Sequence, residues 1–422
     1  MLVLLTKRLA RSLLRTKLRL AAVSAMVMVA VFAGISFAAY AHTVSGMYDE
    51  IYEDSDQGVN LPDVWVENPS GTWDANMSNL LCEEISNQWP DSSLVLNDCE
   101  PRLRLDGTMF LSVIGDESES EKLVPAVWHG IDEGRIDRVW IPEHDCCSGR
   151  LASSDSEIVI DQRVASGMEI ELGDNVSIGA GSGRMSFTVV GIGFHSNHLW
   201  FAPEGSLFPA EPGTFATGYL SSSGLERLAN ISSGSSNIIL IDVLGTPDYD
   251  IPTTDEDEGT DLSSLISSID ETVSNLEDNP SLVYDRSQVF SVEILRADAE
   301  GAMLFYVPVT GMIAAIAGIT IFLSLQRLVQ SQSREIAILR TLGIPRYAIM
   351  PAYFLMPLAI GVIGGALGVI LAVTLGVPGM LGFYEEVVGV PILESTEIFP
   401  LTVQILSVTI LVVMASGVLP AI

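Results

Sequence analysis

Four long apolar stretches dominate the pattern of hydrophobic and polar positions. They cover residues 20–42, 302–325, 349–377 and 399–422, and none of them contains Asp, Glu, Lys or Arg. A helix rises 1.5 Å per residue, so about 20 apolar residues cross a hydrocarbon core roughly 30 Å thick. The pattern therefore predicts four transmembrane helices. The lack of charged residues in them disfavours ion conduction and proton-coupled transport, which generally use buried charged groups.

The long segment between the first two stretches, residues 43–301, has a different pattern. Apolar and polar residues alternate in 157–161, 176–178, 186–191 and 237–243, as in short half-buried strands. Residues 261–277 instead place Leu262, Leu265, Ile266, Ile269, Val273 and Leu276 on one helical face, after an acidic linker at 246–260. The predicted fold is thus an α-helical membrane protein with four transmembrane helices and an α+β domain inserted between helices 1 and 2.

Positive charge predicts the orientation of these helices. Six Lys and Arg residues and no acidic residue lie within residues 1–42, and four Arg residues lie in 326–348, between the second and third stretches. Lys and Arg concentrate in cytoplasmic loops, so we expect residues 1–19, an amphipathic interfacial helix, and 326–348 to be cytoplasmic. Residues 43–301 and the acidic loop 378–398 are then outside the cell membrane, as expected for a multi-pass protein whose N-terminus is cytoplasmic.

The net charge of the chain also limits which binding partners and which kind of source organism are expected. The chain has a net charge of −32, with 53 acidic against 21 basic residues, most of the acidic ones in 43–301. Such a domain repels phosphate, so nucleic acid is not an expected partner, whereas membrane lipids are. An acidic surface with three Lys residues is typical of proteins that function at high salt, and a halophilic source is expected; an acidic outer domain from an ordinary cell is the alternative.

Motifs for catalysis and cofactor binding are not found in the sequence. There is no nucleophile elbow, zinc-protease His pair or phosphate-binding Gly-Lys-Ser/Thr loop, so we expect no catalytic residue, no cofactor and no ATP site in this chain. His144, Cys146 and Cys147, and separately His195 and His198, are metal-type ligands without the spacing of a zinc site, and no metal is expected.

Two groups of small or reactive residues have structural interpretations. Cys82 and Cys99 could close a short disulfide loop outside the membrane, although four Cys residues allow three pairings. In the third stretch, two small-xxx-small pairs interleave, which predicts close helix packing in lipid; they are formed by Gly361, Gly364, Gly365 and Gly368.

Residues 330–350, QSQSREIAILRTLGIPRYAIM, carry the most specific motif in the chain. They resemble the cytoplasmic signature of the MacB/FtsX-type permease family, in which an Arg-Glu-Ile…Leu-Arg-x-Leu-Gly pattern precedes the third span. The matching positions are Arg334, Glu335, Ile336, Leu339, Arg340, Leu342, Gly343 and Ile349, and Pro345 departs from the pattern. The segment EIVIDQRVASGMEIELGDNVSI followed by FTVVGIG also resembles the family's MacB-like extracytoplasmic domain.

This resemblance implies a permease subunit that works with a separate, dimeric ABC-type ATPase. In that case Arg334, Glu335, Ile336, Leu339, Arg340, Leu342 and Gly343 couple the permease to the ATPase, and interfacial anchoring is the alternative role for their charges. The implied function is export or extraction of a lipid-linked, peptide or hydrophobic substrate. The alternative is an FtsX-like regulator that relays ATPase cycles to an extracytoplasmic hydrolase.

The resemblance also implies a second permease unit, because a dimeric ATPase offers two coupling sites. The chain ends directly after the fourth apolar stretch, and the loop with Tyr384, Pro391 and Leu393 resembles that of ten-span relatives. We therefore expect a homodimer, a heterodimer, or the first half of a longer permease.

Overall fold

The computed structural model describes residues 17–48, 60–90, 94–114, 119–132, 136–139, 147–203, 206, 208–244, 261–277, 280–341, 346–388 and 397–418. The chain divides into two compact units, a helical unit and a β-rich unit, with the boundaries near Met47 and Asp298. Each unit is described by itself. The interfacial helix predicted at 1–19, apart from its last three residues, and the acidic linker predicted at 246–260 lie outside the described residues.

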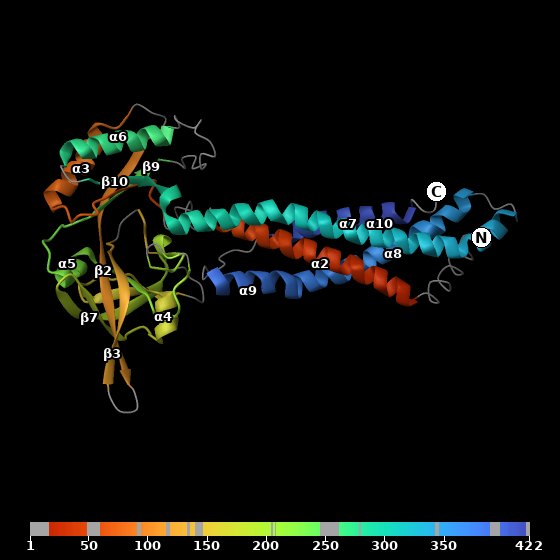
Figure 1. Cartoon of the computed structure of the whole chain (residues 1–422), viewed down its shortest axis with the longest axis horizontal. Coiled ribbons are helices and arrows are strands. Elements are labelled where there is room, and N and C mark those ends of the chain that lie inside the picture. The colour runs from red at the N-terminus through yellow and green to blue at the C-terminus, as the bar shows by residue number, and fades with distance from the viewer. Residues whose placement is uncertain are drawn as a thin grey trace. The chain divides into compact units, whose positions relative to one another are not determined.

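The helical unit is built from α2 (Lys17–Tyr48), most of α7 (Phe290–Thr341), α8 (Arg346–Leu371), α9 (Val377–Val388) and α10 (Ile398–Val418) (Figure 1). Four stretches in these helices are long and apolar enough to cross a membrane. They are Ala21–Met47, Phe290–Leu323, Pro357–Glu386 and Ile398–Ala415. The sequence prediction of four such helices is confirmed.

One helix, α7, joins three segments that the sequence analysis treats separately. Its 52 residues include the polar stretch before the second apolar segment, that segment itself, and most of the predicted cytoplasmic segment. Pro308 lies inside the helix without ending it. Residues 342–345, which include Gly343 of the predicted coupling motif, are outside the described residues, and α8 begins directly after them.

The third apolar helix is longer than predicted and differs from the expected boundary at residue 377. A single π-helical turn, Ala372–Gly376, joins α8 to α9, and α9 continues to Val388, so the first part of the predicted loop 378–398 is helical. The sequence Gly-Val-Pro-Gly suggests a break because proline lacks an N–H group. Here Pro378 follows the π turn as the second residue of α9, where that missing donor is tolerated.

Apolar residues of α2 form the centre of the helical unit. Val23, Val27, Val31 and Ile35 repeat every four residues and are almost fully buried. By contrast, α7 and α10 expose large apolar side chains, including Leu304, Phe305, Phe399 and Leu411. Such a surface requires lipid or further helices around it.

The β-rich unit contains a ten-stranded sheet with the order β10-β1-β9-β2-β3-β8-β5-β7-β4, and β6 pairs with both β2 and β7. The strands are β1 (Val64–Glu67), β2 (Leu96–Ile114), β3 (Glu119–Gly130), β4 (Ser148–Gly149), β5 (Glu157–Asp161), β6 (Asn175–Ala180), β7 (Gly183–Gly193), β8 (Ala216–Leu220), β9 (Ile238–Val243) and β10 (Leu282–Asp285). The predicted strands at 157–161, 176–178, 186–191 and 237–243 correspond to β5, β6, β7 and β9.

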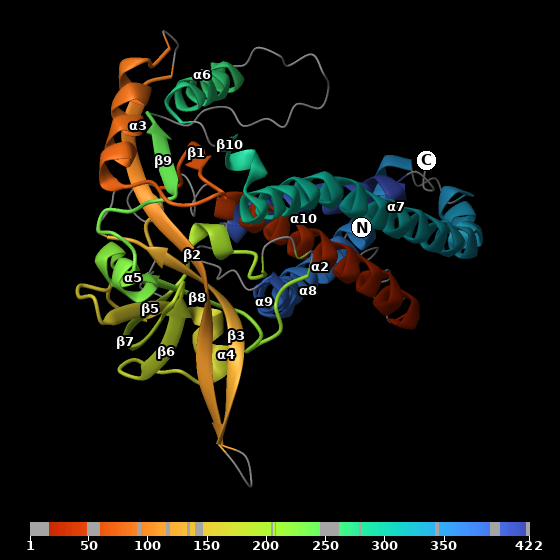
Figure 2. The same ribbon diagram turned by 60° about the vertical axis from the view of Figure 1, so that its left-hand side comes forward.

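Strand β2 connects two lobes of this unit, and Figure 2 shows it running from one to the other as a single long strand. The first half of β2 pairs with β9, whereas its second half forms a hairpin with β3 and also pairs with β6. We call the part around β1, β9 and β10 the α3/α6 lobe, and the part around β3 and β5 to β8 the α4/α5 lobe.

Helices α3 (Ala75–Asn87) and α6 (Asp261–Leu276) cover the sheet of the α3/α6 lobe. Leu265, Ile269 and Val273 of α6 are buried against β1 and β9, as the helical periodicity predicts. Cys82 of α3 and Cys99 of β2 form a disulfide, the pairing considered in the sequence analysis. This lobe is therefore held by an apolar core and one covalent bond.

The α4/α5 lobe has the larger core and two short helices with side-chain caps. The carboxylate of Asp161 accepts a hydrogen bond from the backbone of α4 (Gln162–Met168), and Ser221 does the same for α5 (Ser222–Ala229). Trp128 is fully buried, and its indole N–H donates to Gly179 O at 3.0 Å. The end of β3 and Phe215, which directly precedes β8, line the cavity described below.

Candidate functional site

The residues of the predicted coupling motif lie at the C-terminal end of α7. Arg334, Glu335, Ile336, Leu339 and Arg340 belong to this helix, whereas Leu342 and Gly343 lie outside the described residues. The motif is therefore placed on a helix that is continuous with the second apolar span. Any displacement of the motif along that helix can pass into the span without crossing a loop.

Two of the predicted packing glycines, Gly364 and Gly368, lie against α2. A Cβ atom at Gly364 would be 2.6 Å from Ser24 O, and one at Gly368 would be 2.7 Å from Met28 O. Both contacts are with backbone, which cannot rotate away as a side chain can. Only glycine fits at these two positions, and it lets α8 approach the backbone of α2.

The other two glycines, Gly361 and Gly365, lie against α10 instead. A Cβ atom at Gly365 would be 2.5 Å from Leu406 Cδ1, the flexible end of a side chain, and one at Gly361 would make ordinary contacts at 3.6 Å or more. The interleaved pairs thus contact two different helices. The α2 side requires glycine strictly, whereas the α10 side can adjust.

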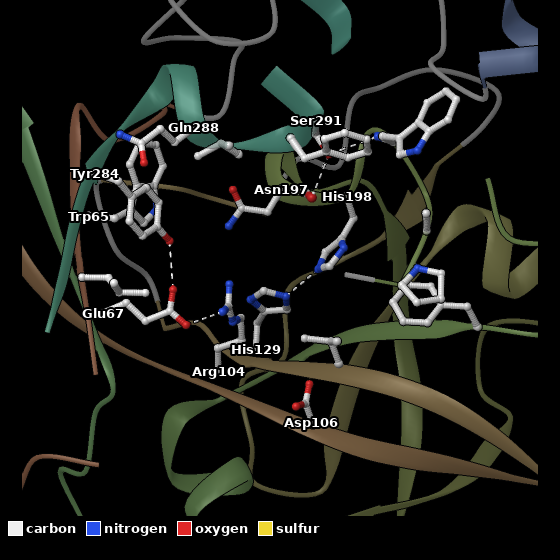
Figure 3. Close-up of a pocket in the computed structure, with 18 residues that line it drawn as sticks. Trp65, Glu67, Arg104, Asp106, His129, Asn197, His198, Tyr284, Gln288 and Ser291 are labelled. Atoms are coloured by element: carbon white, nitrogen blue, oxygen red, sulfur yellow. Dashed lines mark hydrogen bonds and ion pairs between the residues drawn. The ribbon is translucent and has the colours of Figure 1, made fainter. Parts of the chain in front are cut away.

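The β-rich unit contains a cavity of about 310 Å³ between its two lobes. Strands β1 and β10 of the α3/α6 lobe form one side, the end of β3 and the loop after β7 form another, and the first residues of α7 complete it (Figure 3). A volume near 300 Å³ is at the lower end of the range typical for small-molecule sites. Sequence analysis did not predict this cavity, because its walls come from segments more than 200 residues apart.

An aromatic pair and an ion pair form the side next to β1 and β10. The rings of Trp65 and Tyr284 stack with their centroids 5.8 Å apart. Glu67 accepts hydrogen bonds from Arg104 Nη2 at 2.6 Å and from the Tyr284 hydroxyl at 3.0 Å (Figure 3). The carboxylate is mostly buried, and these two bonds offset the cost of removing it from water.

Three buried histidines meet at the bottom of the cavity and behind it. His129 of β3 and His198 of the short helix η2 (Ser196–His198) lie with their Nε2 atoms 2.7 Å apart. His195 lies behind them, 3.3 Å from the carboxylate of Asp137, and its ring stacks on that of Tyr219. Burial, together with the neighbouring histidines, holds the pKa of both His129 and His198 well below the usual value, so both are neutral at pH 7.

The side formed by the loop after β7 presents Asn197. Its side-chain amide points into the cavity (Figure 3), and its Oδ1 atom is buried without a hydrogen-bond partner among the described residues. The backbone around it is well fixed. Ser291, in the first turn of α7, donates from Oγ to Asn197 O at 2.9 Å and accepts from Trp200 N at 3.2 Å.

Two arginines, the partly buried Arg163 and the buried Arg286, hold the surrounding loops. Arg163 donates to the backbone oxygens of His198 and Leu199 at 2.6 and 2.7 Å, and it pairs with Asp161. Arg286, in the short helix η3 (Arg286–Gln288) just before α7, donates to Leu61 O and Pro62 O and lies 3.2 Å from Asp63. The cavity walls are thus preorganised by charge-assisted hydrogen bonds.

The candidate metal ligands from the sequence are only partly visible. His195 and His198 are brought together with His129, whereas His144 and Cys146 lie outside the described residues, and Cys147 is buried. Among the residues that the structure describes, no group of three His, Cys, Asp or Glu side chains is placed to hold a metal ion. The arrangement instead provides aromatic surfaces, one ion pair and one unpartnered amide, which together suit non-covalent binding.

The fold and the sites define a class of protein: a membrane protein with four apolar helices, a glycine-packed third helix and a β-rich domain with a cavity. Residues 309–422 match the family described as FtsX-like permease C-terminal, which covers most of α7 and all of α8, α9 and α10. This match spans 114 of the 422 residues and supports the FtsX/MacB-type family of ABC-transporter permeases. Members generally work with an ABC ATPase partner, and the family suggests a permease subunit. A comparison with curated proteins found no match.

Proposed function

We propose that this chain is a permease subunit that couples ATP hydrolysis by a separate ABC-type ATPase to conformational work outside the membrane. The proposal rests on the continuity of helix α7. This single helix holds the coupling motif near one end, an apolar span in its middle, and at its other end Phe290 and Ser291 in the wall of the cavity. A rigid helix of this kind can transmit displacement between a cytoplasmic partner and an outer domain.

The orientation follows from charge. Lys17 and Arg19 at the start of α2, and Arg334 and Arg340 at the end of α7, support a cytoplasmic location of these ends under the positive-inside rule. The β-rich unit is then extracytoplasmic, with a MacB-like role as the working domain. The substrate class is a lipid-linked, peptide or hydrophobic molecule that is extracted or exported at the outer surface.

The apolar faces of α7 and α10 support a second permease unit. Large apolar side chains on these two helices are exposed within one chain, including Val307, Met312 and Ile316 on α7. A partner permease, either a second copy or a related chain, covers part of this surface, and lipid covers the rest. Two units would then match the two coupling sites of an ATPase dimer.

The decisive experiment reconstitutes the chain with its co-purified ATPase in vesicles and measures ATP hydrolysis. Replacing Glu335 and Arg340 together with Ala should abolish the stimulation of hydrolysis, because both charges are assigned to the ATPase contact. Arg327→Ala, a cation lost from the same helix outside the motif, is the matched control and should keep the stimulation. Full stimulation in the double variant would refute the assignment.

Crosslinking in native membranes distinguishes the transporter function from the regulator function. Recovery of an ABC ATPase crosslinked within residues 330–350, with no hydrolase bound, supports a transporter. Recovery of a cell-wall hydrolase on the β-rich unit supports instead an FtsX-like regulator, and the absence of any ATPase contradicts both.

We also propose that the acidic composition adapts the chain to high salt. Repulsion among its acidic groups weakens as the Debye length falls from about 10 Å at 0.1 M salt to about 3 Å at 1 M. The thermal transition of the purified chain should therefore rise with KCl concentration. A transition that is unchanged or lower at high KCl contradicts this adaptation.

A further inference from the structure

The cavity between the two lobes combines features that select one kind of ligand. Its ionisable lining residues are Glu67, Asp106 and Arg104, besides the histidines, which are neutral at pH 7. Arg104 is already bonded to Glu67, so no free cation faces the cavity from these three residues. The lining therefore carries a net charge of about −1 and disfavours an anionic ligand.

Apolar contact comes from aromatic rings of four different segments. Trp65 lies on β1 and Tyr284 on β10, whereas Phe215 directly precedes β8 and Phe290 begins α7. An apolar group of the ligand can be enclosed between them.

The side chain of Asn197 offers the ligand a polar contact. Its amide points into the cavity with an unpartnered, buried Oδ1 atom, and a carboxamide offers one acceptor and a donor group side by side. A peptide group has the same two functions in reverse order, so it can pair with both. A buried acceptor without a partner costs free energy that such a ligand recovers.

We propose that this cavity binds a short peptide segment that carries one positive charge and an apolar side chain. Asn197 pairs with a peptide group of the ligand, Glu67 and Asp106 attract its positive charge, and the aromatic rings enclose its apolar side chain. Because Ser291 ties the Asn197 loop to the first turn of α7, binding is linked to the helix that carries the coupling motif. That the peptide is the exported cargo rests on the proposed function, whereas its binding does not.

The test uses the full chain in detergent and three peptides of one shape. They are leucyl-phenylalaninamide with one positive charge, its neutral acetylated form, and acetyl-leucyl-phenylalanine with one negative charge. Isothermal titration should give the tightest binding for the cationic peptide, with a dissociation constant of about 0.1–1 mM, and the weakest for the anionic one. Equal binding of all three peptides, or no binding at millimolar concentration, overturns the proposal. So does tighter binding of methyl glucoside, which would indicate a sugar site.

Variants make the test specific to the residues. Asn197→Leu keeps the volume but removes the amide, and it should weaken binding of all three peptides about 5-fold, as expected for one hydrogen bond. Glu67→Gln leaves Arg104 without its carboxylate, so it should remove an about 3-fold preference for the cationic peptide and improve binding of the anionic one. Glu83→Gln, on the exposed face of α3, is the matched control and should change neither property.

The outcomes are independent of the ATPase. An unchanged thermal transition shows that each variant is folded, and binding is measured without a nucleotide or partner. If the Asn197 and Glu67 variants bind all three peptides like the native chain, the cavity is not the peptide site, whatever the ATPase experiments show. If peptide binding follows the predicted order while ATP hydrolysis is not coupled, only the proposed permease function fails.

Discussion

The helical unit and the β-rich unit satisfy their polar groups in opposite ways. In the helical unit, Ser and Thr hydroxyl groups bond within their own helix, as Ser36 does to Phe32 O and Thr374 to Ile370 O, both four residues away. The Tyr384 hydroxyl of α9 is an exception, because it donates to Asp298 of α7 at 3.4 Å. In the β-rich unit, polar side chains bond across the fold: Arg286 reaches Leu61, and His129 reaches His198. Lipid supplies no hydrogen bonds, so a membrane helix must be locally self-sufficient, whereas a water-exposed domain can use polar contacts to join distant segments.

The two units should therefore be destabilised by different kinds of change. The helical unit depends on shape, because its helices meet through glycine and small apolar groups and few directional bonds join them. The β-rich unit depends on the charge and hydrogen-bonding state of a few buried groups. Changes in side-chain size should therefore damage the first unit, and changes in covalent or protonation state should damage the second.

The largest effect is expected from filling the contact between α8 and α2. Gly364→Val together with Gly368→Val places side chains where a Cβ atom would already lie within 2.7 Å of backbone oxygens. Overpacking usually costs about 1–3 kcal/mol per site, and contact with backbone places these sites at the upper end. The double variant should therefore yield no monodisperse protein in size-exclusion chromatography.

Matched controls come from other glycines of the helical unit. Gly311→Val in α7 fills open space, and Gly361→Ala makes ordinary contacts with Ile410 and Val413, so both variants should elute like the native chain. Gly365→Ala should lie between the two groups, because Leu406 Cδ1 can move away. Normal elution of the Gly364/Gly368 variant would mean that shape does not hold this unit together.

A smaller effect, confined to the β-rich unit, is expected from the disulfide. Cys82 and Cys99 are 17 residues apart, and a loop of about 15 residues contributes roughly 3 kcal/mol by restricting the unfolded chain. Cys82→Ser with Cys99→Ser should therefore lower the thermal transition of the β-rich unit. Protection of α3 and β9 amides from hydrogen exchange should fall with it.

The helical unit supplies the control for this experiment. Amides of α2 and α8 should exchange as in the native chain, because the disulfide lies in the other unit. If the double Ser variant destabilises both units equally, the stability of the helical unit is not independent of the disulfide in the β-rich unit.

The same contrast explains what the sequence could predict. Apolar length predicted the four apolar helices, and glycine spacing predicted the close approach of α8 to its neighbours, because both signals are local. A polar helix at about 287–301 that runs into the second span was expected from the sequence. The continuation of α7 past residue 325 and the extension of α9 beyond residue 377 could not be read from it, since polar stretches and Pro378 resemble helix ends. Tertiary contacts and the π turn decide those boundaries.

The cavity was beyond sequence reasoning for a physical reason. His195 and His198 stand out as a local pair, but their partner His129 is 66 residues away from His195, and Glu67 meets Tyr284 across 217 residues. Strand pairing brings these residues together, and strand order was not predicted. One signal was available: the polar HSNH sequence directly follows an apolar strand, where a loop at a sheet edge often carries binding residues.

The smallest effect predicted is a pH dependence of the β-rich unit. His129 and His198 have depressed pKa values in the folded state because they are buried beside one another and beside His195, with Arg104 also nearby, whereas the unfolded chain has the ordinary value near 6.5. Below pH 6.5 the unfolded state binds more protons, so stability falls as pH decreases and is constant above that value with respect to these groups. Each histidine that stays neutral removes about 1.4 kcal/mol per pH unit in this window.

Replacing His198 with Gln keeps a neutral hydrogen-bonding side chain and removes one of these titrating groups. Its thermal transition should therefore fall less between pH 6.5 and pH 5.5 than that of the native chain, even if it is lower at pH 7.5 because the contact with His129 is altered. An identical pH slope in the native and His198→Gln chains would show that the buried histidines do not make the β-rich unit sensitive to protonation, and the contrast with the helical unit would then rest on covalent and size effects alone.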